Sequence, residues 1–118
     1  MILHIASRAD WEEAQARGEY RAASLAAEGF IHCSTEKQVL PVANAFYRGR
    51  NDLVLLVIEP SRLTHELKWE APAGPPAAGI SESDRFPHIY GVLDLAAVAS
   101  VVRFAPGPDG MFVLPSLT

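Results

Sequence analysis

The chain has 118 residues, 49% of them hydrophobic, with ten basic residues and a formal net charge of -4. This length fits one domain over 1–118 with one core, and this composition excludes a disordered chain. The basic residues do not cluster, so no nucleic-acid footprint is expected. No apolar run approaches the roughly 20 residues of a membrane span, and neither a membrane segment nor a signal peptide is expected.

Capping residues and turns divide the first half of the chain into alternating strands and helices. The expected elements are a strand over 2–5, a helix that Ser7 caps and that ends before Gly18, a short helix over 24–28, a strand over 30–33, and a helix that follows Thr35 and ends at Gly49. Pro41 lies inside the last helix. The regular part of that helix therefore begins near Leu40, or the helix is kinked at the proline.

The second half of the chain is dominated by predicted strands. Residues 53–58 are apolar without alternation, which predicts a central strand covered on both faces. Further strands are expected over 67–70, 88–92, 98–104 and 111–114. Because helices come early and strands come late, the pattern predicts an α+β fold with a mixed or antiparallel sheet. Residues 71–85, rich in Ala, Pro, Gly and Ser, are the longest expected loop, either a mobile active-site lid beside a pocket or a plain excursion.

Polar side chains alternate with apolar ones along two of the predicted strands. Alternation places His32 and Ser34 on one face, and it places His88 and Tyr90 together on another strand. Because polar groups gather in binding sites, we predict that these four side chains border one pocket. Cys33 points away from His32, which favours a buried thiol over a nucleophile, and a single cysteine suits the reducing cytoplasm where we expect the protein.

Two segments resemble a family of small bacterial proteins known as domain of unknown function 952. They are residues 29–34 (Gly-Phe-Ile-His-Cys-Ser) and 86–91 (Phe-Pro-His-Ile-Tyr-Gly). Other matching residues fall in the family's order, at 2–5, 11, 18–20, 44–47 and 69–70, so the resemblance covers nearly the whole chain. The family has no established activity.

The resemblance implies a fold similar to that of ADP-ribosyltransferases, which bind NAD in a cleft between two small sheets. The expected architecture is a split mixed or antiparallel sheet with short helices. In that wider class a histidine or arginine grips a ribose, an aromatic ring stacks on nicotinamide, and a late glutamate holds the nicotinamide ribose. Carried onto this chain, the roles fall to His4 or His32 for the ribose, to Tyr20, Tyr47 or Tyr90 for stacking, and to Glu70 for the positive ribosyl cation.

The resulting hypothesis is an NAD-binding or nucleotide-binding enzyme related to ADP-ribosyltransferases, with NAD as the candidate substrate. Its catalytic candidates are Glu70 and His32, and its ligand-binding candidates are His4, Tyr20, Ser34, Tyr47, His88 and Tyr90. The alternative function is a non-catalytic module that binds a small ligand in the same cleft. Each residue also has a structural alternative, such as a core histidine bonded to backbone or an exposed ion pair of Glu70 with Lys68.

A metal-dependent hydrolase is the remaining alternative. Three histidines on converging strands would suit zinc. However, the sequence contains no His-x-His or His-x-x-x-His pair and no second cysteine, so we predict no tightly bound metal. The sequence leaves the oligomeric state open.

Overall fold

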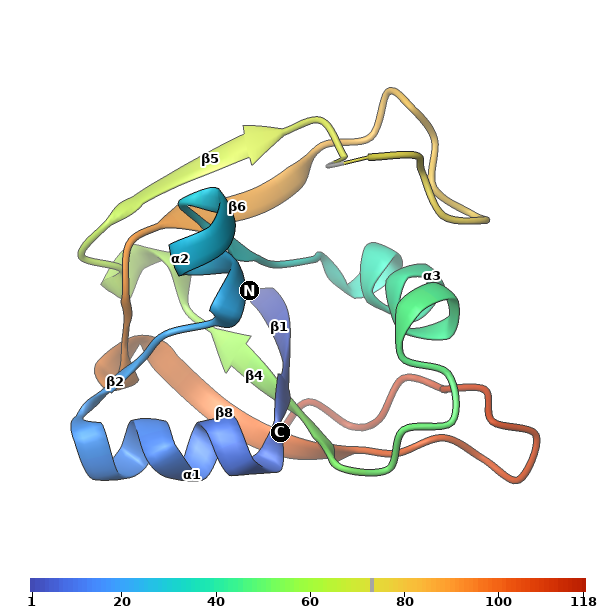
Figure 1. Ribbon diagram of the computed structural model, residues 1–118, viewed down its shortest axis with the longest axis horizontal. Helices are drawn as coiled ribbons and strands as arrows, with labels where there is room; N and C mark the ends of the chain where they lie inside the picture. Colours follow the sequence, from blue (N-terminus) through green and yellow to red (C-terminus); the bar gives the residue numbers. More distant parts are fainter. Residues whose placement is uncertain (73) are drawn as a thin grey trace.

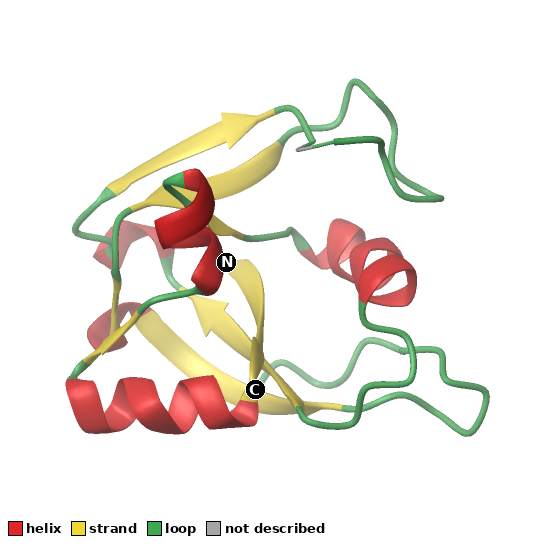
Figure 2. Cartoon of the chain, in the orientation of Figure 1, coloured by secondary structure: helices red, strands yellow, loops and turns green. Residues whose placement is uncertain are grey.

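The computed structural model describes residues 1–72 and 74–118, and within them the chain forms an α+β arrangement of short helices and antiparallel sheets (Figures 1 and 2). The strands are β1 (Ile2–Ser7), β2 (Glu19–Tyr20), β3 (Ile31–His32), β4 (Leu53–Ile58), β5 (Glu66–Glu70), β6 (Phe86–Tyr90), β7 (Leu93–Asp94) and β8 (Val98–Phe104). The helices are α1 (Arg8–Arg17), α2 (Ala23–Glu28) and α3 (Glu36–Phe46), with 3-10 turns η1 (Pro60–Arg62) and η2 (Leu95–Ala97).

One three-stranded sheet has β4 at its centre, in the order β1-β4-β8, with both pairings antiparallel. All six residues of β4 are buried. Alternate side chains enter two separate apolar clusters: Leu56 packs with Ile31 and Ile89, whereas Leu55 packs with Val39 of α3. The prediction of a central strand covered on both faces is therefore confirmed.

Helices α1 and α3 begin where Ser7 and Thr35 predict, but α3 ends at Phe46, with Tyr47 as its C-cap, and not at Gly49. The Ser7 side chain accepts the backbone N–H of Asp10 at 3.1 Å, and α1 ends at Gly18. Helix α3 begins at Glu36 and continues through Pro41, so the helix begins before Leu40.

A second three-stranded sheet, in the order β3-β6-β5, is joined to the first through the end of β3. Leu3 of β1 and Ser34 exchange two backbone hydrogen bonds of 2.8 Å. On the other side, the N–H of Cys33 donates to the carbonyl of Pro87 at 3.0 Å. The segment that follows β3 thus forms a seam between the two sheets, and the candidate site lies there.

One expectation about the later part of the chain is wrong. Residues 111–114 form no strand; Phe112 is instead held by ring stacking on Phe104, with centroids 4.6 Å apart. The large apolar side chain of Trp69 on β5 is 51% exposed. The short pair β2-β7 was not predicted, because two-residue strands carry no periodic signal. Within the described ranges, no helix has the length and apolarity required to cross a bilayer.

Candidate functional site

A pocket of about 550 Å³ lies at the seam between the two larger sheets. Its lining residues come mainly from β1, α2, the segment after β3, α3 and the loop that joins β5 to β6. The polar side chains that line it are those of His4, Ser7, Asp10, Tyr20, Ser24, Glu28, His32, Ser34, Tyr47, Arg50 and His88. The loop contributes an apolar wall that includes Pro75, Pro76 and Ile80. The loop therefore borders the pocket, as predicted, whereas its mobility stays a prediction.

His4 is buried on β1 and both of its ring nitrogens are engaged. Nδ1 lies 2.5 Å from the backbone oxygen of His32, and Nε2 lies 2.8 Å from the hydroxyl of Tyr20. Because a carbonyl oxygen only accepts, Nδ1 carries the proton and the Tyr20 hydroxyl donates to Nε2. Burial lowers the pKa of His4 to about 4, so the ring is neutral near pH 7. Burial likewise raises the pKa of Tyr20, which stays protonated.

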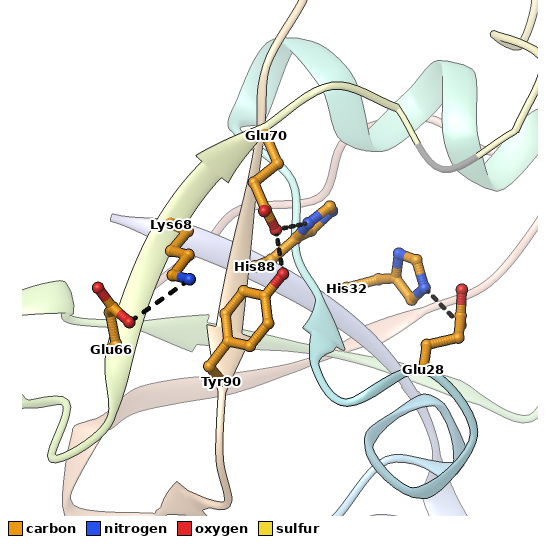
Figure 3. Close-up of polar contacts among 7 residues, drawn as sticks. All are labelled: Glu28, His32, Glu66, Lys68, Glu70, His88 and Tyr90. Carbon is orange, nitrogen blue, oxygen red and sulfur yellow. Dashed lines mark hydrogen bonds and ion pairs between the residues drawn. The ribbon is translucent and has the colours of Figure 1, made fainter.

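His88 is held by Glu70 on the neighbouring strand (Figure 3). Its Nδ1 donates to Glu70 Oε1 at 2.9 Å, and the hydroxyl of Tyr90 donates to the same oxygen at 2.5 Å. The hydrogen bonds from Tyr90 and His88 lower the pKa of Glu70, so this carboxylate is ionised. The carboxylate fixes a proton on Nδ1, and Nε2 of His88 has no hydrogen-bond partner among the described residues.

His32 stands directly opposite His88 in the ladder of β3 and β6. The backbone bond between the next pair, Cys33 and Pro87, makes the histidine pair a non-hydrogen-bonded one, in which side chains approach closely. The two imidazole centroids lie 5.3 Å apart at 77°. His32 has its own carboxylate, with Nε2 2.8 Å from Glu28 Oε2 (Figure 3).

Phe30 fixes the orientation of both rings. It stacks on His88 with centroids 4.2 Å apart and an interplanar angle of 21°, and it meets His32 edge-on at 4.8 Å. Tyr90 approaches the same phenyl ring at 5.4 Å. These contacts place His32, His88 and Tyr90 on one face of the sheet, as the alternation predicts.

Tyr47 and Arg50 also line the pocket. The Arg50 guanidinium lies 5.6 Å from the centroid of the Tyr47 ring, and it binds both carboxylate oxygens of Asp52, at 3.0 and 2.8 Å. Burial raises the pKa of Tyr47, whose phenol stays neutral. Arg50 is the one lysine or arginine among the lining residues identified in the described chain.

The N-terminus of α3 is partly satisfied by its own cap. The backbone N–H of Thr35 donates to Gln38 Oε1 at 3.0 Å, as the predicted capping box requires. The amide nitrogen of Gln38 also donates to the carbonyl of Arg85 at 2.7 Å, which ties the loop before β6 to this helix. Fewer backbone donors at this helix N-terminus are thus free for an anionic ligand.

Cys33 also borders the pocket but is only 3% exposed. Burial raises the pKa of its thiol well above the usual value, so the nucleophilic thiolate does not form near neutral pH. The expectation of a buried, unreactive cysteine agrees with this environment.

Six of the eight predicted site residues line the pocket, and two do not. Glu70 and Tyr90 lie behind His88, outside the lining, while His4, Tyr20, His32, Ser34, Tyr47 and His88 border the cavity. The roles assigned to all eight remain predictions.

Sequence reasoning missed five polar residues that also line the cavity: Ser7, Asp10, Ser24, Glu28 and Arg50. The periodicity of helices and strands does not predict that these residues line one cavity, because they come together only when the elements that carry them pack against one another. Ser24 Oγ is fully buried and has no hydrogen-bond partner among the described residues. No group of three or more His, Cys, Asp or Glu side chains in the described part of the chain is arranged to hold a metal ion.

The sequence and the fold were compared with those of known proteins. The sequence model of the family described as "Protein of unknown function (DUF952)" matches residues 5–101. The crystal structure of protein CC0527 from Caulobacter crescentus is 37% identical, with a TM-score of 0.81 over 96% of this chain and 93% of that one. The solution structure of CC0527 gives 37% identity and a TM-score of 0.75 over 93% and 89%. No curated protein matches the sequence.

Proposed function

Because the chain belongs to the DUF952 family, whose description assigns no activity, we propose its function from its own pocket: it binds NAD or a related nucleotide. The supporting observation is the cavity of about 550 Å³ in which imidazole and hydroxyl groups face apolar walls. Such groups suit ribose hydroxyls, and the proline-rich wall suits a base. Small-molecule sites typically measure roughly 300–1,000 Å³.

Within this proposal His32 is favoured over His4 as the group that orients a ribose. Both nitrogens of His4 are engaged by the protein, by the His32 carbonyl and by Tyr20. His32 keeps Nδ1 free while Glu28 holds its Nε2. His4 then acts through Tyr20, whose hydroxyl oxygen keeps lone pairs for a ligand.

The enzymatic form of the proposal follows the resemblance to ADP-ribosyltransferases. Nicotinamide would leave from NAD through an oxocarbenium-like ribosyl cation, with a tyrosine stacked on the leaving group. The pocket at the junction of two small sheets supports this form. We place this activity in the reducing cytoplasm, where a free thiol such as Cys33 persists.

The second candidate is a non-catalytic module that binds the same ligand. One observation favours it: Glu70, the residue expected to stabilise the ribosyl cation, lies outside the pocket lining and binds His88 and Tyr90 instead. A module of this kind would bind NAD or ADP-ribose and release no nicotinamide.

Titration calorimetry with NAD and ADP-ribose tests the binding proposal. We expect a Kd between micromolar and millimolar, or about -8 to -4 kcal/mol, because the one arginine identified in the lining is already paired with Asp52. His32→Ala should weaken binding by roughly 1–3 kcal/mol through the lost hydrogen bond. His65→Ala, a change at an exposed histidine outside the lining, is the matched control. Absence of binding at millimolar NAD to folded protein would reject the proposal.

A further inference from the structure

The pair formed by Glu70 and His88 has the geometry of a positioned base. His88 is 3% exposed, its ring is stacked on Phe30, and its Nδ1 is fixed by the carboxylate. Its Nε2 has no hydrogen-bond partner in the described chain. This atom is not among the fully buried polar atoms that lack a partner, so part of its surface is accessible to solvent. The pocket is the space that this residue lines.

We infer that His88 accepts a proton from water in this pocket, with Glu70 as its positioning residue, so that the bound nucleotide is hydrolysed. The inference rests on the proposed function and names the acceptor that the proposal leaves open. A side chain of a protein acceptor cannot reach a ring that is 3% exposed, whereas a water molecule can.

The hydrolysis of NAD balances without any further reactant. The bond between C1′ of the nicotinamide ribose and the nicotinamide nitrogen breaks, and its electron pair leaves with neutral nicotinamide. The oxygen of water bonds to C1′, and one water proton passes to Nε2 of His88. The products are ADP-ribose, nicotinamide and one proton, which the ring then releases to solvent. Glu70 stabilises the imidazolium that forms between these steps.

Charged and titratable groups around His88 come from each strand of its sheet. Glu70 and Lys68 lie on β5, with the Lys68 amine 4.6 Å from the centroid of the Tyr90 ring. His32 approaches from β3 at 5.3 Å, and Tyr90 shares the oxygen of Glu70 from β6 itself. Of these groups, only Glu70 is hydrogen-bonded to the His88 ring. We therefore expect its charge to set the acid limb of the pH profile of nicotinamide release.

The experiment measures nicotinamide release from NAD by the full chain between pH 5 and 9, beside NAD binding by calorimetry. His88→Gln should lower kcat by about 10²–10⁴-fold, the usual contribution of a general base, a far larger change than the one it makes in the Kd of NAD. Glu70→Gln should lower the maximal rate of nicotinamide release and move the acid limb of its pH profile to lower pH, because the charge that stabilises the protonated His88 ring is lost. Glu70→Asp, which keeps the charge, should restore the position of that limb.

Glu66→Gln is the matched control, since Glu66 lies on the same strand and pairs with Lys68 at 3.7 Å instead of with a histidine (Figure 3). Its profile should match that of the unmodified protein. Nitrogen NMR should show His88 protonated on Nδ1 and bare on Nε2 at pH 8. NAD bound without nicotinamide release, release that His88→Gln leaves unchanged, or the opposite tautomer would overturn the inference alone. No binding of NAD would overturn the nucleotide proposal and the inference with it.

Discussion

The buried neutral His4 predicts a specific dependence of stability on pH. Its pKa falls from 6.5 to about 4, chiefly because burial disfavours the imidazolium, while the backbone bond to His32 acts in the opposite direction. Above pH 6.5 the ring is neutral in both the folded and the unfolded chain, and the contribution to stability is fully present. As the pH falls from 6.5 to 4, only the unfolded chain binds the proton, so stability is lost.

The size of the loss follows from the two pKa values. Each pKa unit corresponds to about 1.4 kcal/mol, so full protonation of the unfolded chain against a neutral folded ring costs about 3 kcal/mol. Most of this, about 2–3 kcal/mol, should be lost by pH 4.5, where the unfolded chain is fully protonated and the folded ring is still mainly neutral. The total free energy of unfolding of a domain is typically about 5–15 kcal/mol.

Urea unfolding from pH 7.5 to 4.5 measures this loss. Carboxylates also titrate in this range, so the informative quantity is the difference between the unmodified protein and His4→Gln. The variant starts less stable, by about 1–3 kcal/mol for imperfect hydrogen bonds to the His32 carbonyl and Tyr20, but its free energy of unfolding should fall by about 2–3 kcal/mol less over the range. His65→Gln, at an exposed histidine, should run parallel to the unmodified protein. Parallel curves for His4→Gln would refute the reasoning.

Two further predictions concern the segment that carries the chain from α2 into the seam. Gly29→Ala should destabilise the fold by about 1 kcal/mol, because Gly29 has a φ of 88° and open space around it, so that only backbone strain changes; an unchanged midpoint in urea would contradict this. Cys33 should react with a thiol reagent only after unfolding, because it is buried and its pKa is raised, and labelling of the native protein at the rate of a free thiol would show that the seam opens.

The elements of this fold were predictable where the signal is local. The continuous apolar run over 53–58 is β4 with the same bounds, and the alternation around His32 assigns Ile31 to the core and His32 to the opposite face. Both patterns depend only on the two-residue period of a strand and on burial. The first residues of α1 and α3 were predictable from Ser7 and Thr35 for the same reason, because a cap acts on the next three residues.

What failed depends on contacts distant in the sequence. Residues 111–114 have the composition of a strand, but within the described residues they pair with no other strand. Phe112 is held instead by Phe104 and by the side chain of Asn44, whose oxygen accepts its N–H at 2.7 Å. Trp69 lies on an edge strand whose outer part faces solvent, so its apolar side chain stays 51% exposed.

The candidate site shows the same division between local and distant information. Glu70 was selected through a resemblance, for contact with a ribose, yet its carboxylate is occupied by groups from the next strand. The register that pairs Glu70 with Phe86 brings its carboxylate within 2.9 Å of His88 Nδ1, and the register of β3 and β6 sets His88 against His32. A shift of one residue in the register of β3 and β6 would turn the two histidines to opposite faces, and the same shift between β5 and β6 would turn Glu70 away from His88. The carboxylate therefore reaches the pocket only through the imidazole, and any reaction that needs Glu70 must pass its effect through His88.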